Sequence, residues 1–342
     1  MRACQYAVAD CHSRLFRLRL EMFPSKNSVF MIDILLIILG IAIVLRGADN
    51  LTDGSVSIAR RLRISELVIG LTIVAFGTSM PELCVSVVSA TNGSTAMAIG
   101  NVVGSNIFNV FLIVGVCAVI HPMSVSLDII RRDIPFAFIA TLLLIFFLKD
   151  GLLSRAEALI MLVGFIGYVA YTLYIARGTA QKNPASQPQQ EVKDNAIKIS
   201  FKILVGLAEL IVGSNIFVGH ATSLATTLGV SDAVIGITIL GAGTSLPELA
   251  TSAVAALKGR TSMALGNVIG SCLFNILMIL GVSAIIVPLS PDGITTVDLA
   301  TLFASIVLLW FFSFTKQTMA RWEGAVLSLC FIAYMTFLIY NA

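Results

Sequence analysis

The chain repeats part of itself, and this repeat restricts its fold more than any other feature. Shifted by 166 residues, segment 67–116 aligns without gaps on segment 233–282, and 28 of the 50 positions are identical. GTSMPEL at 77–83 matches GTSLPEL at 243–249, and GNVVGSNIFN at 100–109 matches GNVIGSCLFN at 266–275. Self-similarity at a fixed offset indicates that one structural unit occurs twice in the fold.

The composition indicates that this fold lies in a membrane. Hydrophobic residues make up 57% of the 342 residues and charged residues only 12%, whereas soluble domains carry about 25% charged residues. So few charges cannot cover a surface that faces water, so the sequence predicts a polytopic membrane protein. The net charge of +3 and the lack of a basic stripe exclude a nucleic-acid partner.

We expect an all-α membrane protein of ten transmembrane helices, because ten segments approach the roughly 20 apolar residues that a spanning helix needs. The first and sixth are long and interrupted by small and polar residues, which predicts a strong tilt. The segments are 32–59, 66–91, 96–120, 134–148, 153–175, 198–226, 232–257, 262–288, 297–314 and 322–340.

The loop charges predict the orientation. If the chain starts outside, the cytoplasmic loops hold fourteen Lys and Arg residues and the outer loops hold two, Lys149 and Arg155. Lys and Arg concentrate on the cytoplasmic side of membranes. We therefore expect an integral protein of the bacterial inner (plasma) membrane with both termini outside the cytoplasm, and with the polar segment 178–197 as a cytoplasmic linker.

The linker separates two halves, 31–177 and 198–342, of five segments each. Because five is odd, the second half must enter the membrane from the opposite side, which predicts an inverted-topology repeat with a shared site near the midplane.

Residues 1–30 conflict with the orientation because they carry five basic residues. We expect them to be an N-terminal extension outside the working protein, with translation starting at Met22 or Met31; the alternative is a transit-like presequence.

Two glutamates lie in the middle of predicted spans. Glu82 and Glu248 are at matching positions of the repeat, and a carboxylate at bilayer depth costs at least about 2.5 kcal/mol, which marks it as functional. The structural alternative is a Glu paired with a buried base, but Arg46 is the only deep candidate.

Pro81 and Pro247 predict a kink at each Gly-Thr-Ser, because proline lacks an N–H and clashes with the carbonyl four residues earlier. We expect the kink to release carbonyls near Thr78 and Thr244, and those of Ala75 and Gly241.

The polar side chains around these carboxylates offer oxygen. Thr78, Glu82 and Ser86 are four residues apart, and so share a helix face; Thr244, Glu248 and Ser252 repeat this stripe. Ser105 with Asn109 and Ser271 with Asn275 have the same spacing. An oxygen set without a His or Cys cluster favours a hard cation such as Ca²⁺ over zinc or copper.

Other polar residues carry less information. Asp49 and Glu209 either line an access path or snorkel to the interface, and we expect His121 and His220 to be interfacial. Asp128, Asp133, Asp292 and Asp298 lie near predicted loops, so we expect them to be solvated. No Ser-His-Asp or Cys-His arrangement suggests an enzyme.

The paired GTSxPEL and GNVxGSxxFN motifs resemble those of the cation/calcium antiporter superfamily, close to bacterial sodium/calcium exchangers, over nearly all of 31–342. The resemblance implies ten transmembrane helices, inverted repeats and exchange of Na⁺ for Ca²⁺, with no cofactor and no obligate protein partner. It implies that Glu82 and Glu248 are central ligands of both ions and that Thr78 and Thr244 give carbonyl oxygens to Ca²⁺. It also implies that the flanking sodium positions are Ser79, Ser245, Ser105, Ser271, Ala75, Gly241 and Asn109. Asn275 stands where some relatives carry Asp, which argues against potassium dependence.

The residues leave several functions open. Two carboxylates are neutralised by one Ca²⁺ or by Na⁺ ions, and mutually exclusive loading gives antiport. The nearest alternative is a proton-coupled exchanger of Ca²⁺ or another divalent cation. A cation channel and a receptor that only binds the ion are further alternatives, but inverted repeats favour alternating access.

Overall fold

The computed structural model describes residues 26–182, 195–230, 235, 238–239 and 241–341, and these are almost entirely helical. Most of the doubtful segment 1–30 and of the linker 178–197 lies outside the described residues. η1, η2, η3 and η6 are π-helical and η4 is a 3₁₀ turn. The elements are α2 (Lys26–Leu62), α3 (Glu66–Ile69), η1 (Gly70–Val74), α4 (Ala75–Thr78), α5 (Met80–Thr91), α6 (Thr95–Ile107), η2 (Phe108–Val114), α7 (Gly115–Ile120), β1 (Met123–Ser124), η3 (Ile129–Asp133), α8 (Ile134–Phe147), η4 (Leu148–Asp150), α9 (Arg155–Lys182), α10 (Ala196–Thr227), α12 (Gly241–Gly243), α13 (Leu246–Leu257), α14 (Thr261–Leu273), η6 (Phe274–Ile279), α15 (Leu280–Ile286), α16 (Thr296–Phe314), β2 (Thr318–Met319) and α17 (Arg321–Asn341).

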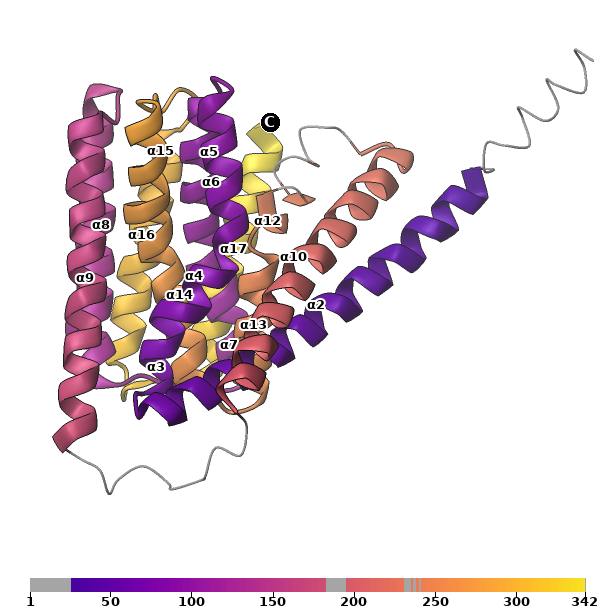
Figure 1. Ribbon diagram of the computed structural model, residues 1–342. Coiled ribbons are helices and arrows are strands. Elements are labelled where there is room, and N and C mark those ends of the chain that lie inside the picture. Colours follow the sequence, from indigo (N-terminus) through magenta and orange to yellow (C-terminus); the bar gives the residue numbers. More distant parts are fainter. Residues whose placement is uncertain (1–25, 183–194, 231–234, 236–237, 240, 342) are drawn as a thin grey trace, which may run out of the picture.

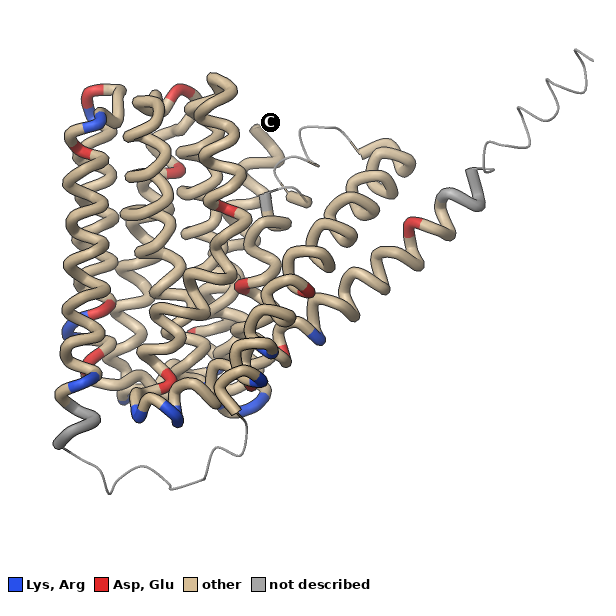
Figure 2. Tube along the Cα trace, in the orientation of Figure 1, with Lys and Arg blue, Asp and Glu red and all other residues tan. Residues whose placement is uncertain are grey.

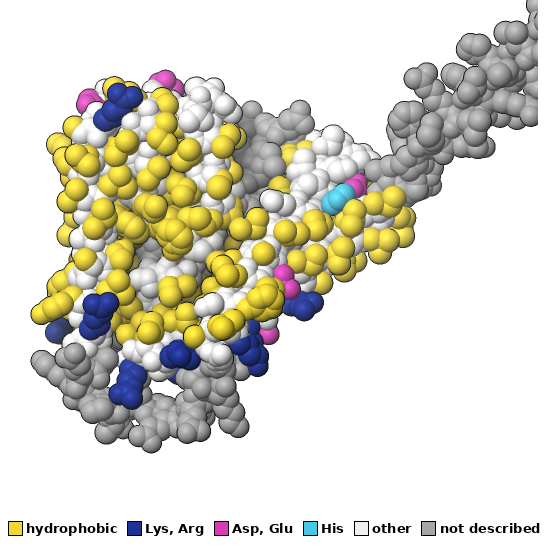
Figure 3. Space-filling view, in the orientation of Figure 1, with side chains coloured by type: hydrophobic (Ala, Val, Ile, Leu, Met, Phe, Trp, Pro, Cys, Tyr) yellow, Lys and Arg dark blue, Asp and Glu magenta, His cyan; other side chains and the backbone are white. Residues whose placement is uncertain are grey.

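The helices are those of a membrane protein. Among the described residues, seven helical stretches are long and apolar enough to cross a bilayer, and an eighth is formed if the bent pair 66–78 and 80–91 is one span. Two predicted spans, 134–148 and 232–257, correspond to the shorter helices α8 and α13. Apolar side chains cover most of the visible bundle surface, and charges lie mainly toward its two ends (Figure 3). The predicted all-α membrane class is therefore confirmed, whereas the structure identifies seven or eight of the ten predicted spans.

Two long helices stand apart from the bundle. α2 and α10, the predicted first and sixth spans, lie side by side and are strongly inclined to the other helices (Figure 1). They approach closely at glycines: a Cβ on Gly47 would lie 2.8 Å from the Gly206 carbonyl oxygen, and one on Gly40 would lie 2.9 Å from that of Gly213. Small residues permit such contacts between membrane helices, so α2 and α10 form one closely packed pair.

Contacts outside the aligned repeat also occur in related pairs. Met123 in β1 pairs with Met319 in β2, and Leu289 pairs with Leu153 in an isolated bridge. Position 289 is position 123 plus 166, and 319 is 153 plus 166, so each bridge is the counterpart of the other. The similarity of the two halves therefore extends into their peripheral loops.

Two aspartates that we expected to be solvated are buried. Asp133 is 0% exposed and accepts hydrogen bonds from Arg132 and, at 3.0 Å, from the Tyr168 hydroxyl. Asp298 is 9% exposed; its carboxylate accepts hydrogen bonds from Thr295, the N-cap of α16, and from the Tyr334 hydroxyl at 2.7 Å. The expectation was wrong because these residues lie at helix starts that pack inside the bundle, where hydrogen bonds offset the cost of burial.

Most charged side chains gather at one end of the molecule. Lys and Arg concentrate at the end where α3 lies, and the chain ends at the opposite end (Figure 2).

Arg46 lies within the inclined pair, where its Nε is 3.2 Å from Glu209 Oε1. Asp49 forms an ion pair with Lys258. His121 is exposed, but His220 Nδ1 donates to the buried carboxylate of Asp33 at 2.8 Å and joins the far ends of α2 and α10.

Candidate cation-binding site

Each Gly-Thr-Ser-x-Pro segment interrupts a helix, as its proline predicts. Ser79 (φ −85°, ψ 10°) ends α4, and Ser245 (φ −88°, ψ 7°) precedes α13. The axis bends by 46° between 66–78 and 80–91. Pro81 and Pro247 fall in the first turns of α5 and α13, where the missing N–H costs nothing. The two breaks place Glu82 and Glu248 in the first turns of new helices.

The two halves cross at these breaks. The Ser79 hydroxyl donates to Glu248 Oε1 at 2.7 Å, and the Ser245 hydroxyl donates to Glu82 Oε1 at 3.0 Å. All four residues are 0% exposed. Each carboxylate is therefore held by the hydroxyl of the other half, and the two repeats build one site.

Two asparagines that the sequence analysis did not select support this site. Asn267 donates to Ser252 Oγ at 2.9 Å and accepts from Thr78 Oγ1 at 3.3 Å. Asn101 donates to Ser86 Oγ at 2.9 Å, and Thr244 Oγ1 lies 3.5 Å from its Oδ1. The two asparagines occupy matching positions in the repeated Gly-Asn-Val. Their identity in both copies was a signal for a shared role.

The asparagines also contact the backbone of the helices that carry the two glutamates. Asn101 Nδ2 donates to the Glu82 carbonyl at 3.2 Å, and Asn267 Nδ2 lies 3.5 Å from the Glu248 carbonyl. Each therefore ties a hydroxyl of one half to the carboxylate helix of the other. The two expected stripes of polar residues are therefore connected by the asparagines. Asn267 contacts Thr78 and Ser252, and Asn101 contacts Thr244 and Ser86.

Several buried oxygens in this region have no hydrogen-bond partner among the described residues. An unpartnered buried acceptor costs about 1–3 kcal/mol, and a bound cation would offset this cost for any of these oxygens that it contacts. The set is Glu82 Oε2, Glu248 Oε2, Ser105 Oγ, Ser271 Oγ, Asn109 Oδ1 and Asn275 Oδ1.

π-helical turns position the two amides at the far end of the motifs. Asn109 lies in η2 and Asn275 in η6, and both are 0% exposed. α13 packs against η2, and α5 packs against η6, so each amide comes from one half and lies beside the carboxylate helix of the other. π-Helical turns inside longer helices are frequent at functional sites.

Cys272 explains a difference between these amides. Asn275 Nδ2 lies 3.5 Å from Asn106 Oδ1, but the position that matches Asn106 is Cys272, whose sulfur is a weak acceptor. Asn109 Nδ2 accordingly has no partner among the described residues, whereas the Oδ1 atoms of Asn109 and Asn275 are alike in having none. The repeat is therefore not fully symmetric in its ligands.

One expectation about backbone ligands was wrong. The Ala75 carbonyl is not released by the kink, because it accepts from the Ser79 N–H at 3.0 Å. The helix continues through Thr78, and the break falls at Ser79, within the expected Gly-Thr-Ser. Gly241, its counterpart, begins α12.

The charge of the site is not balanced by a nearby base. No ion pair among the described residues involves Glu82 or Glu248, and Arg46, the one deep candidate, pairs with Glu209. No group of three or more His, Cys, Asp or Glu that could hold a metal is found in the described part of the chain. The arrangement therefore offers two carboxylates among neutral oxygens, which suits a hard cation that binds reversibly.

A buried pair of carboxylates shared by two helix breaks within a helical membrane protein fits the class of membrane transporters of cations. The family model described as "Sodium/calcium exchanger protein" matches residues 32–174 and 200–340, and the chain belongs to this family.

Known relatives agree with this assignment. The chain is 38% identical over 305 residues to the "Putative antiporter CaxA" of Alkalimonas amylolytica, covering 87% of this chain and 96% of the relative. It is 33% identical over 350 residues to the "Sodium/calcium exchanger MaX1" of Methanosarcina acetivorans, covering 90% and 99%. The sodium-calcium exchanger NCX_Mj, in a structure soaked with 2.5 mM Na⁺ and 0.1 mM Ca²⁺, superposes with a TM-score of 0.78 at 30% identity, covering 89% of this chain and 98% of that one. The protein is a cation/Ca²⁺ antiporter of this family.

Proposed function

We propose that the protein is a secondary active antiporter that exchanges Na⁺ for Ca²⁺ by alternating access at one site near the membrane midplane. The crossed hydrogen bonds Ser79–Glu248 and Ser245–Glu82 carry this proposal, because they make both halves indispensable to one buried site. The fold that accompanies it has ten transmembrane helices in two inverted repeats of five. The paired breaks, paired bridges and the odd number of predicted spans per half support this topology.

Charge balance explains why two ions compete. Glu82 and Glu248 carry a charge of −2 when ionised, which one Ca²⁺ or two Na⁺ neutralise. A buried charge without a partner is costly, so a site without ions opposes the conformational step, and either load permits it. Occupancy by one kind of ion at a time then couples the two fluxes.

The proposed ligands divide into two groups. Glu82 and Glu248 bind both ions, and Thr78 and Thr244 add backbone oxygens for Ca²⁺. The flanking positions for Na⁺ are Ser79, Ser245, Ser105, Ser271, Asn109, Asn275, Ala75 and Gly241. The second lone pair of the Ala75 carbonyl keeps it among these candidates. Asn101 and Asn267 orient the ligands rather than bind the ions.

Sodium is favoured over protons as the coupling ion by the number of neutral oxygens. A proton needs only the carboxylates, whereas Ser105, Ser271 and Asn109 have buried oxygens with no partner among the described residues. Such oxygens are suited to coordinating a metal cation, whereas binding a proton requires only a carboxylate. A proton-coupled exchanger is the alternative, and it predicts Ca²⁺ flux driven by a pH gradient alone.

The orientation follows from the basic end of the molecule. We propose that the end rich in Lys and Arg faces the cytoplasm of a bacterial inner membrane, which places both termini outside.

Neutralising either carboxylate tests the site. Glu82→Gln and Glu248→Gln should each reduce Na⁺-driven Ca²⁺ uptake into proteoliposomes to background, because the remaining single charge cannot balance Ca²⁺ in a buried site. The exposed Asp292→Asn serves as the matched control and should leave uptake unchanged. Normal uptake by both Glu variants would refute the site.

A further inference from the structure

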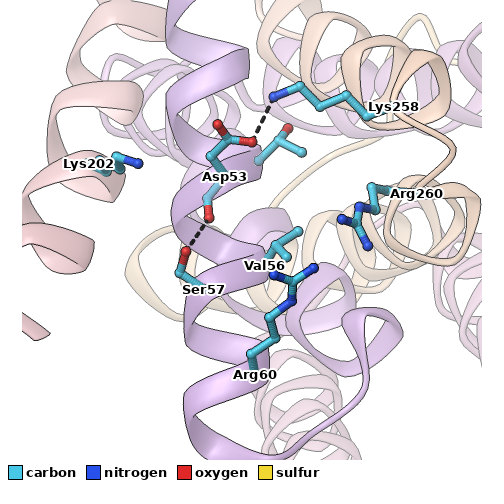
Figure 4. A pocket seen from close by; sticks show the side chains of 8 residues that line it. Asp53, Val56, Ser57, Arg60, Lys202, Lys258 and Arg260 are labelled. Carbon is cyan, nitrogen blue, oxygen red and sulfur yellow. Dashed lines mark hydrogen bonds and ion pairs between the residues drawn. The ribbon is translucent and has the colours of Figure 1, made fainter. Parts of the chain in front are cut away.

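One lysine connects the inclined helix pair to the helix that carries Glu248. Lys258 follows the last turn of α13, and its Nζ lies 2.6 Å from Asp49 Oδ1 and 2.7 Å from Asp53 Oδ1, both on α2. Figure 4 shows the lysine reaching across to Asp53. Burial lowers the pKa of Lys258, but its bonds to the two aspartates outweigh this and raise the pKa above its ordinary value. The lysine is therefore charged throughout the neutral range.

A second ion pair lies beside the first. Arg260 Nη1 is 2.7 Å from Glu66 Oε1 of α3. A pocket of about 410 Å³ opens along this seam between α2, α10 and the loop after α13, and Arg60 and Lys202 also line it (Figure 4). The side chains of Lys258, Asp49 and Asp53 remain 32%, 54% and 49% exposed. Half-exposed ion pairs are weak, so these contacts can break and re-form during a transport cycle.

The other repeat lacks these charges. Subtracting or adding 166 places Asn92 opposite Lys258, Ser94 opposite Arg260, Asn215 opposite Asp49 and Gly219 opposite Asp53. The preference for basic residues in the cytoplasm accounts for Lys258 and Arg260. This preference does not account for Asp49 and Asp53. Both lie within 2.7 Å of the Lys258 amine, and their counterparts in the other repeat are uncharged.

We propose that Lys258, Asp49 and Asp53 form a one-sided ionic latch that holds α2 against α13 and favours the conformation closed at the basic end. The inference rests on the proposed alternating access. In an inverted repeat, the two access states exchange the environments of the two halves, so any interaction present in only one half biases their equilibrium. The latch makes an otherwise nearly symmetric exchanger spend more time open at the end opposite the basic residues.

The accessibility of one buried position on the seam tests the latch. Val56 is 7% exposed and lines the pocket. In protein whose native cysteines have been replaced, Val56→Cys held in lipid nanodiscs is labelled with a thiol-reactive maleimide without transported ions. Lys258→Ala should increase the labelling rate about two- to tenfold, the range expected when exposed ion pairs are lost. This readout needs no ion flux, so it stays interpretable if the proposed function fails.

A mutant cycle separates the ion pairs from other effects of the lysine. Asp49→Asn with Asp53→Asn should raise labelling as much as Lys258→Ala, and the triple variant should raise it no further, because each change removes the same interaction. Arg63→Ala, a basic residue of the same end outside the latch, is the control and should have no effect. An unchanged rate in Lys258→Ala, or additive increases in the triple variant, would overturn the latch. Altered labelling in a protein that shows no exchange would refute the proposed function and keep the latch.

Discussion

At the scale of residues, the site depends on hydroxyl groups that reach across the two repeats. Each glutamate has one oxygen fixed by a serine of the opposite half, while its second oxygen has no partner among the described residues. The serines thus hold the carboxylates in position for an ion and leave one oxygen of each carboxylate available.

Removing one of these hydroxyls should weaken Ca²⁺ binding without abolishing it. Ser79→Ala should raise the Ca²⁺ concentration for half-maximal uptake about three- to tenfold, because a typical hydrogen bond contributes about 0.5–1.5 kcal/mol. Ser245→Ala should have a similar effect, since its contact is the counterpart.

Ser290→Ala is the control for these variants, because Ser290 lies outside the site and its hydroxyl donates only to Asp292 Oδ2, while its N–H bond to Thr95 Oγ1 is kept in the variant. A tenfold change in Ser79→Ala with none in Ser245→Ala would contradict the shared site.

The residues of the site were largely predictable from the sequence, because identity between the repeats selects them. Glu82 and Glu248 followed from charge within apolar spans. Asn101 and Asn267 were overlooked, although they are identical in both copies and each lies four residues before a selected serine, Ser105 or Ser271, and so on the same helix face. Asp133 and Asp298 were predicted wrongly, because a sequence does not show whether a helix start lies in the bundle or in water.

At the scale of elements, the inclined pair α2 and α10 is held by glycines. A Cβ on Gly206 would lie 2.7 Å from the Leu51 nitrogen and 2.8 Å from the Gly47 carbonyl oxygen. The backbones are therefore as close as their atoms allow, so the two helices form one closely packed pair.

Adding a methyl group at this contact should separate the helices. Gly206→Ala should lower the free energy of unfolding by about 1–3 kcal/mol, the usual cost of overpacking. This is measured as a reduced thermal-unfolding temperature in detergent. Gly219→Ala, on the same helix with nothing within 4 Å of the added methyl group, is the matched control and should not lower it. Equal unfolding temperatures for both variants would show that the close approach is not required.

The helix breaks were predictable, but their surroundings were not. Pro81 and Pro247 specify where α5 and α13 begin by simple stereochemistry. The π-helical turns that carry Asn109 and Asn275 leave no such signal in the sequence. The pairing of Arg46 with Glu209 depends on the contact between α2 and α10, and the sequence did not place these two residues side by side.

At the scale of the whole molecule, the two halves contribute nearly equivalent residues to the candidate site and unequal charges to its surroundings. The ligand motifs are nearly identical, whereas the charged residues of the seam occur at one end only. A symmetric site with an asymmetric periphery is suited to a transporter that binds the same ions from both sides and favours one access state.

The coupling of Ca²⁺ uptake to Na⁺ tests the central claim most directly. Purified protein in liposomes loaded with Na⁺ should accumulate radioactive Ca²⁺ when the external medium lacks Na⁺. Uptake should fall to background when a sodium ionophore collapses the gradient at constant pH. Uptake that persists after this collapse, or that a pH gradient alone sustains, would contradict Na⁺/Ca²⁺ exchange.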